Sequence, residues 1–191
     1  MEKDRLQAFS DGVIAILITI MVLELKIPHG SGASDLRPLL PVFLSYVLSF
    51  VYLGIYWNNH HHMLHAARHV GGNVLWANLH LLFWLSLVPF ATAWMGENHF
   101  DALPTALYGV NLLLCALAYT VLQRTLIRAD GNASLIAVAV GGDFKGKLSL
   151  AAYAAAIPLA FVHPAMAGAL YVMVALMWLV PDRRIEKVIA G

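Results

Sequence analysis

Long apolar runs recur along nearly the whole of this 191-residue sequence, and they restrict its fold more than any other feature. Hydrophobic side chains make up 60% of the chain and charged side chains only 12%, about half the charged share of a soluble domain. The composition excludes a disordered tail. A net charge of +1 offers no general attraction for nucleic acid, and the single Cys115 cannot form an intrachain disulfide.

Six of these runs approach or reach the length of about 20 apolar residues that a membrane-spanning helix needs. They are Leu6–Ile27, Leu39–Trp57, Val74–Met95, Ala102–Leu122, Leu148–Val162 and Ala165–Val180. The sequence therefore predicts an all-α integral membrane protein with six transmembrane helices, as one domain over residues 1–191.

The shorter runs and the longest connection need separate treatment. We expect the last two spans to form a helical hairpin bent at His163-Pro164, because proline disfavours helix at the preceding residue. The fifth span is expected to begin earlier than Leu148, near Asp143. A short helix over Ser134–Val140 is expected in the connection before it.

Lysine and arginine are distributed very unevenly between the two sides of these spans. Ten of the twelve lie on the side of the termini: Lys3, Arg5, Arg68, Arg124, Arg128, Lys145, Lys147, Arg183, Arg184 and Lys187. The other side holds only Lys26 and Arg37. Because basic loops stay in the cytoplasm, we expect a multi-pass protein of the cell membrane with both termini cytoplasmic.

A narrow apolar stripe runs along one face of the first predicted span. At 100° per residue it is about 60° wide, with Thr19 at its edge, and it comprises Ile16, Ile20, Leu23 and Ile27. Asp11 projects almost opposite. The pattern fits an ordinary apolar helix whose Thr19 hydroxyl bonds its own backbone, and equally a pore-lining helix whose apolar rings form a constriction.

Histidines cluster where the second span approaches the predicted cytoplasmic face. A carboxylate within a membrane normally pairs with a donor, and Arg5, Trp57 and a histidine are available to Asp11 at this depth. His61, His65 and His69 have the i, i+4, i+8 spacing of metal ligands on one helical face. Residues 36–96 contain no cysteine or carboxylate, which favours interfacial histidines without a resident metal.

The remaining motifs give no support for an enzyme. The segment 141–147 is similar to a phosphate-binding loop, but Leu148 stands where a magnesium-binding Ser or Thr is required. No pairing of a nucleophile with a base emerges, so we expect neither catalysis nor a cofactor. His80 and Asn111, inside predicted spans, are expected to form bonds between helices.

The opening of the first span resembles the transmembrane protein 175 family, the lysosomal potassium channels and their bacterial relatives. The resemblance rests on Arg5-x-x-x-Phe9-Ser10-Asp11, on the I-x-x-T-x-x-x-L spacing that follows it, and on Trp57-x-x-His60 at the end of the second helix. One copy of the signature and six spans resemble the bacterial single-repeat form. At the level of topology the likeness covers the whole chain.

The resemblance implies a homotetramer in which four first helices line a central pore for monovalent cations, with potassium passing better than sodium. It implies no T-V-G-Y-G filter, and this sequence has none. By position in the family pattern and in the stripe, the constriction consists of Ile16, Thr19, Ile20 and Leu23. The family's buried network corresponds to Arg5, Phe9, Ser10, Asp11, Trp57 and His60.

An apolar ring can act as a gate by dewetting. An apolar ring offers no oxygen ligands to replace the water that an ion sheds there. Potassium is the more weakly hydrated cation, so its free-energy cost of dehydration is smaller than that of sodium. Thr19 hydroxyls offer partial replacement, and Glu24 at the outer mouth would attract cations. The expected permeant species is therefore potassium and the expected surroundings are a lipid bilayer.

Two alternatives stay open. One is a proton-permeable channel, and the other is a secondary transporter or metal carrier that uses the second-helix histidines. A transporter favours broken helices or a midplane charge, whereas the middle of the first span is apolar apart from Thr19. This favours a channel.

Overall fold

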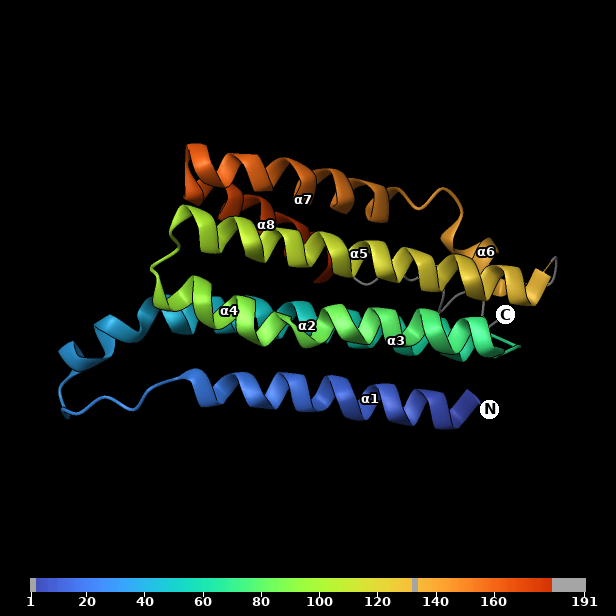
Figure 1. The fold of residues 1–191 in the computed structure, drawn as a ribbon, viewed down its shortest axis with the longest axis horizontal. Helices are drawn as coiled ribbons and strands as arrows, with labels where there is room; N and C mark the ends of the chain where they lie inside the picture. Colours follow the sequence, from blue (N-terminus) through green and yellow to red (C-terminus); the bar gives the residue numbers. More distant parts are fainter. Residues whose placement is uncertain (1–2, 132–133, 180–191) are drawn as a thin grey trace.

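The computed structural model describes residues 3–131 and 134–179, and all regular secondary structure within them is helical. The helices run along one long axis, with α1 at one edge of the bundle and α7 and α8 towards the other (Figure 1). The α-helices are α1 (Lys3–Ile20), α2 (Leu40–Ala66), α3 (Gly72–Ser86), α4 (Val88–Glu97), α5 (Ala102–Asp130), α6 (Leu135–Val140), α7 (Phe144–Val162) and α8 (Pro164–Leu179). Two 3-10 segments, η1 (Met21–Glu24) and η2 (Ala33–Leu39), lie between α1 and α2.

The first span is shorter than its apolar run. The α-helix ends at Ile20, η1 adds one tighter turn, and Leu25 is extended with ψ at 100°. The prediction that helix continues to Ile27 was wrong, because Pro28 follows and proline drives the residue before it out of the helical region. Ile27 therefore lies beyond the stripe that the periodicity assigned to it.

The second span is longer than predicted. Helix α2 continues past Trp57 to Ala66, so its histidines are part of the helix. The apolar run ends near Trp57, but the helix continues because Met63 and Leu64, at 1% and 0% exposure, keep this end packed in the bundle. His69 lies beyond the helix, so the expected face of three histidines was also wrong.

The third span is broken in the middle. Helix α3 ends at Ser86 and α4 begins at Val88, with Pro89 in the first turn of α4. The predicted span over Val74–Met95 is confirmed as part of an apolar segment of membrane length, residues 72–97. It is not one continuous helix, because proline has no N–H and clashes with the preceding turn. Helix α5 crosses this break: with its amide nitrogen turned towards α3, Asn111 donates to the Trp84 carbonyl (3.1 Å) and accepts from Val88 N–H (3.3 Å).

The last two helices form the expected hairpin. Asp143 caps α7 by accepting from Gly146 N–H at 3.2 Å, which confirms an origin near Asp143. The hairpin turns at His163, in extended conformation before Pro164. The short helix α6 is also confirmed, with the Ser134 hydroxyl accepting from Ala137 N–H at its start.

Helix α5 also extends beyond its predicted span, to Asp130 rather than Leu122, and its continuation is packed against the rest of the chain. The Asp130 side chain is fully buried and accepts from the backbone N–H groups of Arg68 and His69 at 2.9–3.1 Å. The end of α5 therefore holds the turn between α2 and α3.

Small residues allow α5, α7 and α8 to pack closely. The inner faces of α7 and α8 contain Ala152, Ala156, Ala160, Ala167 and Ala175, all at most 7% exposed. Close approach through small side chains is typical of helices in membranes. Gly109 on α5 has the same role, since a β-carbon there would collide with the Tyr171 hydroxyl.

Five helical segments are long and apolar enough to cross a membrane: residues 3–24, 33–66, 72–97, 102–130 and 144–162. Helix α8 is equally apolar but has only 16 residues within the described part of the chain. The chain is therefore a multi-pass, all-helical membrane protein.

Candidate functional site

One face of α1 is left uncovered by the other described residues of the chain. Ile16 is 62% exposed, Ile20 45% and Leu23 76%, and Thr19 is exposed between them. We call these four residues the α1 stripe. On the opposite face the buried residues are Leu6, Ser10, Ile14, Leu17 and Met21. The stripe that the periodicity predicted is thus the face of α1 turned away from the chain's own core.

The Thr19 hydroxyl is bonded to its own helix. It donates to the carbonyl oxygens of Ala15 and Ile16 at 3.1 and 3.0 Å, as expected for a threonine in an ordinary apolar helix. This bond uses the hydroxyl proton, while the oxygen keeps lone pairs that can accept. An oxygen held in this way on an exposed face can still contribute to the coordination of a cation.

A buried chain of three polar side chains joins α1, α2 and α3. Asn78 Nδ2 donates to Ser10 Oγ at 2.9 Å, and Asn78 Oδ1 lies 2.7 Å from His60 Nε2. Ser10 Oγ in turn donates to the Leu6 carbonyl. All three side chains are fully buried. Ser10 and His60 are therefore connected, as the family pattern implied, but through Asn78, which sequence reasoning missed.

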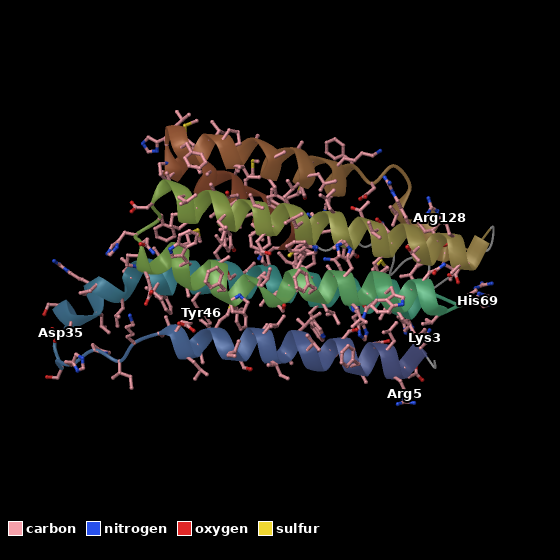
Figure 2. All side chains as sticks on the ribbon, viewed as in Figure 1. Lys3, Arg5, Asp35, Tyr46, His69 and Arg128 are labelled. Atoms are coloured by element: carbon pink, nitrogen blue, oxygen red, sulfur yellow. The ribbon has the colours of Figure 1, made fainter. Side chains whose placement is uncertain are left out.

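The other predicted members of this network lie elsewhere. Phe9 and Trp57 are 51% and 45% exposed, and Figure 2 shows Arg5 directed away from the bundle. Asp11 borders a surface hollow together with Asp4, Gln7 and His65. One Asp11 carboxylate oxygen is buried and lacks a partner within the described part of the chain. The structure does not bring Arg5 or Trp57 of the same chain to Asp11.

The histidines of α2 contact α1. His61 Nδ1 lies 2.7 Å from Gln7 Nε2, and the His61 and His65 rings stack at 6.4 Å. Lys3 donates to the carbonyl oxygens of His65 and Ala67. Among residues 3–131 and 134–179, no group of three or more His, Cys, Asp or Glu side chains is arranged to hold a metal ion. These residues hold α1 against α2.

His80 does not form the expected bond between helices. It accepts from Trp84 Nε1 at 2.9 Å, one turn further along the same helix. His80 is exposed, while Trp84 is partly buried against the core. Asn111 does connect two elements, at the α3–α4 break. Asn111 therefore contributes to the packing of helices, whereas His80 does not.

Just beyond α1 and η1, an exposed ion pair connects the chain to the end of α4. Lys26 Nζ lies 2.7 Å from Glu97 Oε1, at the end of α4. The hydrogen bond to Glu97 raises the pKa of Lys26. Glu24, two residues before Lys26, is exposed at the end of η1. Asp35 lies at the same end of the bundle as this ion pair (Figure 2). At the opposite end of the long axis lie Lys3, Arg5, His69 and Arg128 (Figure 2).

The five apolar segments of spanning length and the uncovered face of α1 define a multi-pass helical membrane protein. A family model described as "Endosomal/lysosomal potassium channel TMEM175" matches residues 5–89. A Chryseobacterium protein named "Potassium channel HX13_20290" is 54% identical over 187 residues, covering 98% of this chain and 97% of the relative. The chain belongs to the TMEM175 family of cation channels and is not an enzyme.

Two further relatives, one bacterial and one human, differ in how much of this chain they match. The crystal structure of a lysosomal potassium-selective channel TMEM175 homolog from Chamaesiphon minutus matches with a TM-score of 0.82 at 25% identity, covering 95% of this chain and 98% of that one. The human protein named "Endosomal/lysosomal proton channel TMEM175" is 34% identical over 87 residues, which cover 37% of this chain and 17% of that protein. The bacterial relatives thus match over far more of the chain.

Proposed function

We propose that this protein is a potassium channel of the cell membrane, weakly selective for potassium over sodium. In this proposal it is a homotetramer of six-span subunits whose termini are cytoplasmic, and four copies of α1 line the pore. The observation that carries the proposal is the α1 stripe, a face of a spanning helix that its own subunit leaves open. One helix cannot enclose a pathway, so copies of the chain must complete it.

The α1 stripe supplies the constriction. Four copies of Ile16, Ile20 and Leu23 form apolar rings that hold little water and oppose the entry of ions. Potassium is dehydrated more readily than sodium and therefore passes more often. Thr19 oxygens compensate for part of the lost hydration, and Glu24 at the outer end raises the local concentration of cations. A T-V-G-Y-G filter has no part in this mechanism.

A flux measurement on Ile16→Asn tests the proposal. Asparagine places an amide in each ring, which holds water, so potassium flux into liposomes should rise and the preference over sodium should shrink. Leu17→Asn is the matched control: Leu17 is next in sequence but only 8% exposed, so this change should lower stability and not selectivity. Unchanged conductance and permeability ratio in Ile16→Asn would place the constriction elsewhere.

Light scattering tests the assembly. The detergent-corrected mass should be that of four chains at concentrations at which the protein conducts. A monomer under those conditions is incompatible with a pore lined by four copies of α1.

Proton permeation is the second candidate function, because human and other vertebrate relatives are named proton channels. The same liposomes, loaded with a pH indicator, separate the two. Acidification driven by a proton gradient in the absence of potassium supports proton passage, while potassium flux without acidification supports a potassium channel.

A further inference from the structure

A cavity of about 210 Å³ lies within the subunit on the side away from α1. Its walls come from α2, α5, α6, the start of α7, and α8, which supplies Trp178. Phe144 lines it while being 71% exposed, so the cavity reaches the molecular surface at the start of α7. None of the residues of the α1 stripe borders it, so this space is separate from the proposed ion pathway.

Aromatic rings form much of the wall: Tyr52, Tyr56, Tyr119, Tyr153 and Trp178 all line the cavity. Several are fixed in place. Tyr52 donates to the Tyr171 carbonyl at 2.6 Å, and Trp178 Nε1 donates to Ser149 Oγ at 2.9 Å. Rings held in this way present rigid flat surfaces, which favour a flat aromatic molecule through stacked and edge-to-face contacts.

One polar side chain in the cavity wall has unused hydrogen-bonding capacity. Gln123 on α5 is 7% exposed and lines the space. Its side-chain amide, which has two donors and an acceptor, makes no hydrogen bond to any described residue. A water molecule can pair with this amide but cannot replace the contacts that the surrounding rings offer. The Gln123 amide therefore favours a ligand that forms a hydrogen bond with it.

The charged groups of the wall favour a neutral ligand. Asp143 and Lys145 carry opposite charges at the start of α7. The Asp143 carboxylate already accepts from Gly146 N–H, and the Lys145 ammonium lies 5.6 Å from the centre of the Trp178 ring. Both charged groups are thus engaged within the chain, so neither is left to select a charged ligand.

From this wall chemistry we propose that the cavity binds a small neutral aromatic molecule that carries one hydrogen-bonding group. The size agrees: an apolar cavity of about 150 Å³ accepts benzene, and the extra volume accommodates a second fused ring. The rings stack on the tyrosines and on Trp178 while the polar group pairs with Gln123. Binding here would act on α2 through Tyr56 and Asn59, beside His60, without entering the pore.

Indole and indene provide the test, because they have nearly the same shape and only indole has an N–H. Thermal unfolding of the purified full-length protein is followed at increasing concentrations of each. We expect indole to raise the melting temperature saturably, with an apparent affinity roughly tenfold above that of indene, as one buried hydrogen bond provides. In Gln123→Leu, indole binding should weaken to the level of indene.

A variant in which the cavity is filled provides the second part of the test. Ala116→Phe projects a ring into the space and should abolish stabilisation by both compounds, whereas Ala129→Phe, on the exposed part of the same helix, should leave it intact. The proposal is overturned if wild type shows no saturable stabilisation by indole, if indene binds equally well, or if indole still stabilises Ala116→Phe.

Discussion

Helices α1 and α5 are both apolar and long enough to cross a bilayer, yet their surroundings differ. Over a stretch of 18 residues, 28% of the α1 segment is buried inside the chain, against 50% of α5. Asn111 and Gln123 of α5 are buried, as is Ser10 in the first half of α1, whereas Thr19 near the end of α1 is exposed. Helix α5 organises the subunit, and α1 offers a whole face to something outside it.

The comparison teaches that hydropathy identifies a span but not what the span faces. In a bilayer, lipid tails are as apolar as leucine, so helices associate through packing and hydrogen bonds rather than through removal from water. Helix α5 is surrounded by α3, α4, α7 and α8. Helix α1 is bonded to the bundle at only a few polar positions, and substitutions at those positions should have effects out of proportion to their number.

The largest expected effect is that of Asn78→Ala. This change removes both bonds that connect Ser10 of α1 to His60 of α2. The buried His60 ring loses its partner, and Ser10 Oγ keeps only its bond to the Leu6 carbonyl. We expect a loss of about 3 kcal/mol in unfolding free energy, measured by denaturant titration in mixed micelles. Asn73→Ala, on the exposed first turn of α3, is the control and should be nearly neutral. Equal losses would mean that the buried chain does not hold α1.

The next largest effect is expected inside α5. Leu122→Ala should cost about 2 kcal/mol, because Leu122 is fully buried and its loss leaves a cavity. Ion selectivity should not change. Leu117→Ala removes the same atoms from a side chain that is 43% exposed and should cost much less. Similar costs for the two variants would contradict the packing of α5 described above.

A smaller effect is expected at the end of α5. Asp130→Asn keeps the shape but replaces one acceptor oxygen with a donor that faces the Arg68 and His69 N–H groups. We expect a loss of about 1 kcal/mol and faster hydrogen exchange at these two amides. Asp101→Asn, exposed before α5 with no side-chain capping bond, should leave exchange unchanged. Protection that persists in Asp130→Asn would show that its carboxylate does not hold this turn.

The smallest effect is expected at the outer end of α1. Glu97→Gln removes the partner of Lys26, an exposed pair whose contribution salt screens. Because the pKa of Lys26 is raised by this partner, the stabilisation is present at neutral pH and is lost as the pH rises through that pKa. The melting temperatures of variant and wild type should therefore converge at high salt or strongly alkaline pH. A difference that persists under both conditions would rule out the ion pair as its cause.

Much of this arrangement could be predicted from sequence, because the periodic spacing of apolar residues and the effect of proline on the backbone both depend on residues close together in the chain. The α1 stripe follows from the spacing of its apolar residues, and the α7–α8 turn from Pro164. The break before α4 had an equally local signal in Pro89, which was outweighed by the apolar run around it. The burial of the last turns of α2 was missed because its histidines suggest an interface, while the packing of Met63 and Leu64 depends on neighbours far away in sequence.

The polar connections could not be predicted in the same way. Asn78 is one of several polar residues in the spans, and only the relative depth of α1 and α3 brings it to Ser10. Asp130 reads as a solvated charge at a helix end, yet the fold encloses it at the α2–α3 turn. Such pairings depend on tertiary register, about which the spacing of residues within one helix carries no information.

The apolar character of the α1 stripe bears on how subunits would come together. A face of isoleucine and leucine is as well accommodated by lipid tails as by another protein, so a single inserted subunit pays no solvation penalty for leaving it open. In the proposed tetramer, subunits could therefore insert and diffuse singly before they meet. Their association would then follow mass action within the plane of the membrane, and the ratio of protein to lipid would set the fraction assembled.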